Sequence, residues 1–160
     1  MNTKNLDKII YKTCTHLQSG GVILYPTDTV WGIGCDATNE AAIKKIYSLK
    51  KRSNEKGLIL LMSSKKMLDY YINDIPSIAS ELLKNNNEPT TIIYKNPINL
   101  PKLLIHQNSI AVRLVGKFFI HELIKKFNKP ITSTSANISG CKTPKKFNDI
   151  SLDIKKNVRL

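Results

Sequence analysis

The chain has 160 residues, of which 41% are hydrophobic and 23% are charged. These proportions match an ordinary folded domain and exclude disordered, collagen-like and fibrous proteins, and the longest apolar runs, such as residues 58–62, are too short to span a membrane. The net charge of +13, from 25 lysines and arginines against 12 aspartates and glutamates, favours anionic partners such as RNA, nucleotides or phosphorylated metabolites.

Helical and extended patterns alternate along the chain. In chain order we expect a helix over residues 6–17, a strand over 22–25, a helix over 42–49, a strand over 58–62, helices over 64–71 and 78–83, strands over 90–94 and 110–115, a helix over 119–127 and a strand over 131–134. Gly20-Gly21 ends the first helix, Thr38 caps the second, and Thr143-Pro144 begins a last short helix. This alternation predicts an α/β or α+β fold in one domain over residues 1–160, with helices packed on a sheet.

The cysteines and the N-terminus predict the compartment. Cys14, Cys35 and Cys141 are far apart and have no CxxC spacing, so we expect no metal site and three thiols that act as small buried hydrophobic groups. Residues 1–12 lack the apolar segment of a signal peptide. We therefore expect a cytoplasmic protein with no membrane partner.

The charge surplus has two possible origins. Nearly all of it is lysine, and Lys, Asn and Ile are encoded by A/T-rich codons, so genome composition is an alternative to an anionic partner. The arginines at positions 52 and 113 are more informative, because such a composition does not favour arginine.

Four polar clusters lie at or near the predicted strands, where open α/β sheets bind ligands. They are YPTDTVWGIG (25–34), KKRSNEKG (50–57), IAVRLV (110–115) and STSANISG (133–140). Their hydroxyl, guanidinium and small polar groups are suited to phosphate or carboxylate, but each has an ordinary alternative: a turn, a solvated helix end, an outward-pointing arginine and a polar turn. The chain contains neither a P-loop nor a Gly-x-Ser-x-Gly elbow, which disfavours ordinary NTPases and α/β-hydrolases.

The segments YPTDTVWGIGCD, KKRSNEKGLIL, IAVRLV and PITSTSANISG, in this order and at these separations, resemble the YrdC/TsaC family over about residues 20–144. Members of that family are threonylcarbamoyl-AMP synthases. The resemblance implies a twisted, mostly open mixed α/β sheet with a basic concave face. It also implies a nucleotidyltransferase that converts L-threonine, bicarbonate or CO2, and ATP with Mg²⁺ into threonylcarbamoyl-adenylate and pyrophosphate. The product would serve threonylcarbamoyladenosine formation at position 37 of tRNAs that read codons beginning with A, so tRNA and other proteins of the threonylcarbamoyl-transfer machinery are implied partners.

The resemblance also implies roles for individual residues. L-threonine would be bound by Thr29, Lys95, Arg113 and Ser135, with Arg113 on the carboxylate. ATP would be bound by Lys50, Arg52, Lys56, Thr91, Ser133 and Asn137. No catalytic nucleophile and no protein metal ligand is implied, because positioning and charge stabilisation drive nucleotidyl transfer. The sequence departs from the family just before Thr91, where Asn86-Asn87-Glu88-Pro89 replaces the common Trp-Pro-Gly-Pro.

Two other functions are compatible with the sequence. A non-catalytic module of the same fold would bind double-stranded RNA or tRNA through its lysines, with a steep salt dependence and no consumption of ATP. A structural subunit would only hold partner proteins, and loss of Arg52 and Arg113 would then leave tRNA modification unchanged.

Overall fold

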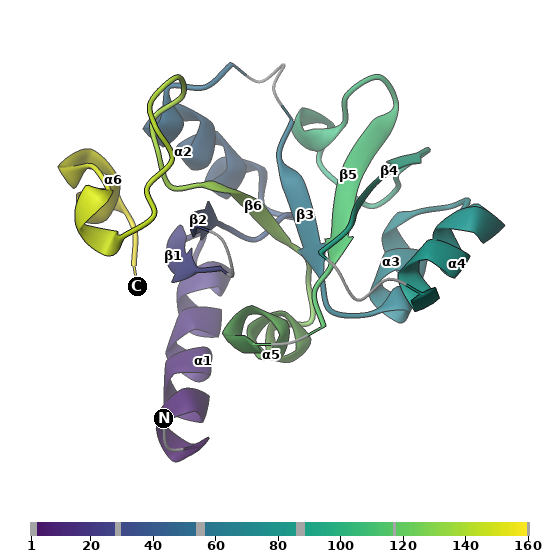
Figure 1. The fold of residues 1–160 in the computed structure, drawn as a ribbon, viewed down its shortest axis with the longest axis horizontal. Coiled ribbons are helices and arrows are strands. Elements are labelled where there is room, and N and C mark those ends of the chain that lie inside the picture. The colour runs from purple at the N-terminus through teal and green to yellow at the C-terminus, as the bar shows by residue number, and fades with distance from the viewer. Residues whose placement is uncertain (1–2, 28–29, 54–56, 86–88, 117, 160) are drawn as a thin grey trace.

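A computed structural model describes residues 3–27, 30–53, 57–85, 89–116 and 118–159. Its strands are β1 (Ile23–Pro26), β2 (Trp31–Gly34), β3 (Ile59–Met62), β4 (Thr91–Lys95), β5 (Ser109–Leu114) and β6 (Ile131–Ser135). They form one sheet in the order β1-β2-β6-β3-β5-β4 (Figure 1). The β3–β5 pair is parallel and the other neighbouring pairs are antiparallel, so the sheet is mixed, as predicted.

The helices are α1 (Thr3–Gln18), α2 (Glu40–Lys50), α3 (Lys65–Tyr71), α4 (Ser77–Asn85), α5 (Phe118–Phe127) and α6 (Leu152–Asn157). Figure 1 shows α1 and α5 together at the bottom of the view, α3 and α4 at the right, and α6 with the C-terminus beyond the β1 edge at the left.

Strand alternation divides the core into two layers, as β3 illustrates. Leu61 packs in a cluster with apolar residues of α1 and α5, whereas Leu60 and Met62 pack in a second cluster with residues of α2, α3 and α6. Successive side chains of a strand point to opposite faces, so the two clusters mark two faces of the sheet. We call them the α1/α5 face and the α2 face.

The ten predicted elements are confirmed, with shifts of at most three residues at their ends. The strand β2 was not expected, because its glycines favour a turn. They are needed for close packing: a Cβ on Gly34 would collide with the carbonyl oxygen of Thr132 on the neighbouring strand β6.

Two predicted helix starts are wrong. The side chain of Asn39, rather than Thr38, caps α2 by accepting a hydrogen bond from the Ala42 amide. Thr143-Pro144 begins no helix. Instead Ser151 caps α6, and the carbonyl oxygen of Pro144 accepts a hydrogen bond from the amide of Trp31.

The three cysteines form no disulfide; Cys14 and Cys35 are buried as expected, but Cys141 is exposed. Within the described ranges no cluster of three His, Cys, Asp or Glu side chains is placed to hold a metal ion. No helix in the described part of the chain has the length and apolar character needed to cross a membrane.

Candidate functional site

The sheet register aligns predicted site residues from three strands on the α1/α5 face. Residues paired across neighbouring strands share a face, and Arg113 of β5 pairs with Thr91 of β4 and with Leu61 of β3. Leu61 belongs to the cluster under α1 and α5, which fixes the face. The adjacent row, two residues along each strand, consists of Ser133, Ile59, Ala111 and Ile93. Ser135 lies one row further along β6. We give the name site rows to the following residues of these three rows: Arg113, Thr91, Leu61, Ser133, Ile59, Ala111, Ile93 and Ser135.

Arg113 is partly exposed and oriented by its neighbour on β4. Its Nε donates a hydrogen bond to Thr91 Oγ1 at 2.9 Å. This bond uses one of the five N–H groups of a guanidinium, and the terminal Nη groups make no other hydrogen bond within the described residues. The two-pronged end of the side chain is therefore available for a carboxylate or phosphate.

Ser133 is oriented by Tyr25, a buried tyrosine that the sequence pattern placed in a strand and at the start of a polar cluster but without a role in the site. The hydroxyl of Tyr25 donates to Ser133 Oγ at 2.7 Å, and the tyrosine is 1% exposed. Burial raises the pKa of the phenol, so the hydroxyl stays protonated as a donor. Ser133 Oγ accepts this bond and keeps its own proton to donate to a ligand.

We expect Tyr25→Phe to lower the free energy of unfolding by about 1 kcal/mol, because it leaves Ser133 Oγ without its buried donor. Urea denaturation measures the change. Tyr47→Phe is the matched control, since the Tyr47 hydroxyl is buried without a partner in the described structure and its removal should cost nothing. An equal loss in both variants would contradict the proposed role of the Tyr25 hydroxyl.

Lys50 ends α2 with its side chain turned into the protein. It is 1% exposed, and its Nζ donates to the backbone carbonyls of Ser135 and of Asn137, the latter at 2.6 Å. The Lys50 carbonyl in turn accepts the amide of Ser139 at 2.8 Å. Burial, together with the nearby Arg52 charge, lowers the pKa of the ammonium to about 8. Through these hydrogen bonds Lys50 holds the segment after β6 against the end of α2. The predicted contact of Lys50 with ATP stays a prediction.

Arg52 follows Lys50 by two residues and lies beside the end of the site that contains Ser135. Its Nη2 donates to the carbonyl of Gly57 at 2.8 Å. Gly57 precedes Ile59 by two residues and so extends β3 toward the row of Ser135. The Gly57 carbonyl that Arg52 contacts is four residues along the chain from Leu61, the β3 partner of Arg113, which is about 13 Å at about 3.3 Å per residue.

The remaining predicted residues differ in how the structure places them. Asn137 uses its Nδ2 to donate to the carbonyls of Cys141 and Ile138, at 2.7 and 3.1 Å, while its Oδ1 is buried and accepts no hydrogen bond from the described residues. Lys95 is exposed on edge strand β4, on the face of Thr91 but about 13 Å farther along the strand. Thr29 and Lys56 lie outside the described residues.

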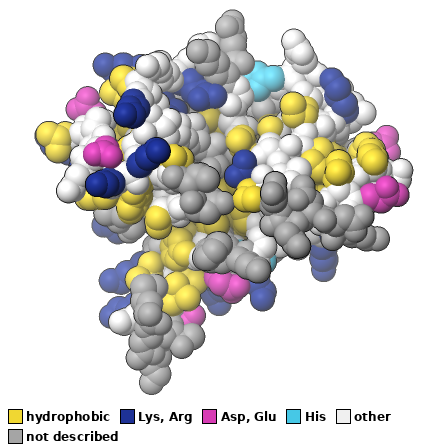
Figure 2. Space-filling model, in the orientation of Figure 1, with side chains coloured by type: hydrophobic (Ala, Val, Ile, Leu, Met, Phe, Trp, Pro, Cys, Tyr) yellow, Lys and Arg dark blue, Asp and Glu magenta, His cyan; other side chains and the backbone are white. Residues whose placement is uncertain are grey.

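An apolar floor between the two arginines was missed by the sequence analysis. Ile59 and Ala111 are only partly buried, and Ile93 on the edge strand is 69% exposed. The alternating pattern around these three residues predicts that they lie in a sheet. It does not show that α1 and α5 leave this part of the α1/α5 face uncovered. Near the centre of Figure 2, a basic side chain lies among yellow apolar ones.

The site rows combine the guanidinium of Arg113, hydroxyls on β6 and an apolar floor, and Arg52 contacts the chain two residues before Ile59. This arrangement is suited to a ligand with two separated anionic groups and a neutral portion between them. The described residues supply hydroxyl and carbonyl oxygens here but no carboxylate cluster. A Mg²⁺ ion would therefore be held mainly by phosphate oxygens.

Comparisons with known proteins agree with this architecture. The Sua5/YciO/YrdC family model, described as "Telomere recombination", matches residues 15–160. The chain is 40% identical to a protein of Photobacterium profundum over 148 residues, 87% of this chain and 77% of that one, and 38% identical to a protein of Psychromonas ingrahamii over 90% and 78%; both are named threonylcarbamoyl-AMP synthase.

Two solved structures share the fold. P. abyssi Sua5 complexed with L-threonine has a TM-score of 0.87 and 28% identity, with 94% of this chain covered. E. coli YciO has a TM-score of 0.82 and 25% identity, covering 96% of this chain and 76% of that one. This chain spans 45% of the length of the Sua5 chain.

Proposed function

The chain belongs to the Sua5/YciO/YrdC family, and on this premise we propose that it is a threonylcarbamoyl-AMP synthase. It would condense L-threonine, bicarbonate or CO2, and ATP into threonylcarbamoyl-adenylate and pyrophosphate. The observation that carries the proposal is the alignment of Thr91, Arg113 and Ser133 on one incompletely covered sheet face. Relatives of the same name, 35–40% identical over most of the chain, support it.

Arg113 would bind the carboxylate of L-threonine. Its Nε is held by Thr91, and the side chain is partly exposed. The floor of Ile59 and Ala111 offers an apolar surface to the threonine methyl group. These contacts would fix the amine so that its nitrogen forms a bond to the carbon of CO2 and loses a proton, giving a carbamate.

The other end of the site rows would hold the nucleotide. The carbamate oxygen attacks the α-phosphorus, and the bond from that phosphorus to the pyrophosphate oxygen breaks. Arg52 and the hydroxyls of Ser133 and Ser135 would bind the phosphate oxygens and stabilise their growing charge. Mg²⁺ bound to ATP supplies further charge neutralisation. No residue need act as a nucleophile, because correct placement of two anions overcomes most of the barrier.

The product would be used in tRNA modification. A mixed anhydride of a carbamate and a phosphate is labile, so it must pass quickly to the enzyme that transfers the threonylcarbamoyl group to adenosine 37 of tRNA. We propose this transfer machinery as the protein's partner.

Purified protein with L-threonine, bicarbonate, Mg²⁺ and ATP is expected to release pyrophosphate, measured by a coupled phosphate assay. Omitting L-threonine should abolish the release, because the carbamate is the attacking group. The matched control replaces L-threonine with L-valine, which has the same shape but lacks the hydroxyl. Pyrophosphate release that is independent of threonine would contradict the substrate assignment.

A further inference from the structure

His106 lies on the tight turn that leads into β5. Its amide donates to the carbonyl of Ser109 at 3.0 Å, and the amide and the hydroxyl of Ser109 donate to its own carbonyl at 2.8 and 2.7 Å. Gln107 and Asn108, the two residues between them, have positive φ angles of 48° and 53°, as a two-residue hairpin turn requires. The backbone of His106 is therefore fixed against the first residue of β5.

The imidazole ring of His106 lies over Gly57, on the α1/α5 face of the sheet. A Cβ placed on Gly57 would be 3.0 Å from ring atom Cδ2 and 3.5 Å from Nε2. Leu58 packs in the cluster on the α2 face, so its neighbours Gly57 and Ile59 both direct the Cβ position toward the α1/α5 face. Continuing the register of β3 with β6 places Gly57 level with Ser135. The ring therefore lies beside the Ser135 end of the site rows.

Two nitrogen-bearing side chains meet at Gly57. Arg52 Nη2 donates to the carbonyl oxygen of this glycine at 2.8 Å, and the ring of His106 covers the side where a Cβ would be. The Nε2 of His106 is buried and makes no hydrogen bond within the described part of the chain. A buried polar atom without a partner destabilises a folded protein, and a ligand that supplies the partner removes this cost.

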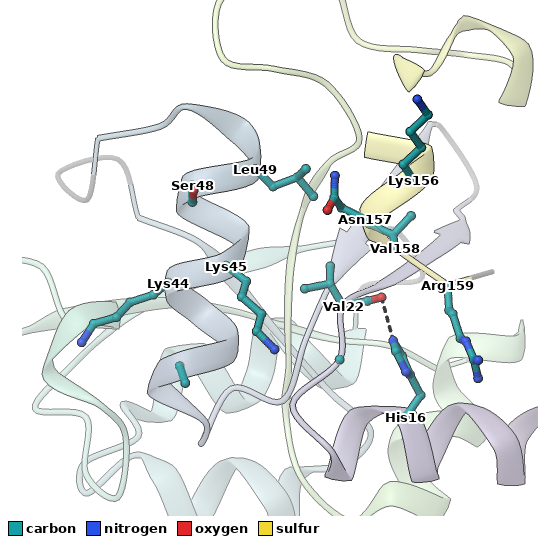
Figure 3. Close-up of a pocket in the computed structure, with 12 residues that line it drawn as sticks. His16, Val22, Lys44, Lys45, Ser48, Leu49, Lys156, Asn157, Val158 and Arg159 are labelled. Atoms are coloured by element: carbon teal, nitrogen blue, oxygen red, sulfur yellow. Dashed lines mark hydrogen bonds between the residues drawn. The ribbon is translucent and has the colours of Figure 1, made fainter. Parts of the chain in front are cut away.

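A second basic region, at the β1 edge of the sheet, contains a histidine of a different kind. A pocket of about 810 Å³, which we call the α2/α6 pocket, lies between α2, the end of α6 and the segment before β1. His16 lines this pocket, and its Nε2 lies 3.2 Å from the carbonyl oxygen of Val22 (Figure 3). None of the described residues that line the pocket belongs to the site rows. His16 is therefore a matched control for His106.

Given the proposed function, on which this inference rests, we propose that His106 Nε2 donates a hydrogen bond to the outer phosphates of ATP. These phosphates leave as pyrophosphate. Ser133 and Ser135 would contact the α-phosphate. Arg52 and His106 flank Gly57, level with Ser135, where the outer phosphates can lie. When the bond from the α-phosphorus to the bridging oxygen breaks, its electron pair stays on the pyrophosphate, and the N–H donors stabilise this charge without giving up a proton.

Isothermal titration calorimetry with magnesium pyrophosphate tests this contact without turnover. His106→Phe keeps a planar ring over Gly57 but has no donor, so it should weaken binding by about 10- to 100-fold. His106→Gln restores an N–H group and should recover part of the loss. His16→Gln should bind pyrophosphate as the wild type does. His106→Phe should also melt at or above the wild-type temperature, because it removes a buried nitrogen that has no partner in the described structure.

Steady-state kinetics distinguish a failure of this contact from a failure of the proposed function. His106→Phe should raise the KM for ATP in threonine-dependent pyrophosphate release and leave the KM for L-threonine unchanged. An active wild type together with a His106→Phe variant of unchanged pyrophosphate affinity would overturn the contact and leave the proposed function standing. Equal losses of affinity and of melting temperature in His106→Phe and His106→Gln would assign the ring a packing role instead. A wild type that binds pyrophosphate but releases none with threonine would contradict the proposed function and, with it, the role of His106 toward ATP.

Discussion

Arg113→Ala is expected to reduce kcat/KM for L-threonine in pyrophosphate release by roughly 30- to 850-fold. This range corresponds to about 2–4 kcal/mol, the loss of a charge-assisted, two-pronged hydrogen bond to a carboxylate. Thr91 already orients the guanidinium by accepting from its Nε, so little ordering cost accompanies threonine binding in the wild type. Steady-state kinetics at varied threonine concentration measure the effect.

Arg113→Lys is the matched control for this substitution. Lysine keeps the positive charge but has no planar fork, so it should recover only part of the lost activity. Arg113 is partly exposed, and both variants should keep wild-type thermal stability to within a few degrees. If Arg113→Ala retained the wild-type kcat/KM for threonine, the carboxylate assignment would be wrong.

Lys50→Met is expected to lower both stability and activity. The substitution leaves the carbonyl oxygens of Ser135 and Asn137 without their donor in a buried position, and each unsatisfied group costs about 1–3 kcal/mol. Relief from desolvating the ammonium offsets part of this cost, so we expect a loss of about 2–4 kcal/mol in the free energy of unfolding. Urea denaturation and kcat are measured on the same preparation. Activity should fall because Ser135 lies in the segment that Lys50 fastens.

Lys51→Met is the control. Lys51 is the exposed neighbour of Lys50, and replacing its lysine by methionine puts no glycine or β-branched residue into its αL backbone. It should change neither quantity. Unchanged stability of Lys50→Met combined with a raised KM for ATP would contradict the positioning role. That result would instead support direct contact with ATP phosphates.

The local sequence predicts most elements but not the side-chain partners within the site. Alternation around Arg113 left open whether this residue points to solvent or to a buried anion. Only the pairing of β5 with β3 and β4 places it with Thr91 on the α1/α5 face. The strand β2 was missed because Gly32 and Gly34 have low strand propensity, and the packing that requires them involves Tyr25 and β6.

The charge run after α2 shows a second limit. A lysine-rich helix end is typical of a solvated surface, and Lys51 fits that pattern. Lys50 does not, because its acceptors are 85 and 87 residues away in sequence. A contact of this kind depends on how β6 and the segment after it pack against α2. Nothing in the residues near Lys50 indicates it.

The most direct test of the proposed site is a crystal structure of the protein with L-threonine and a non-hydrolysable ATP analogue. We expect the threonine carboxylate within hydrogen-bonding distance of the Arg113 guanidinium, and the α-phosphate beside the hydroxyls of Ser133 and Ser135. Threonine bound away from Arg113, or a nucleotide bound on the α2 face or in the α2/α6 pocket, would contradict the assignment of the site rows as the active site.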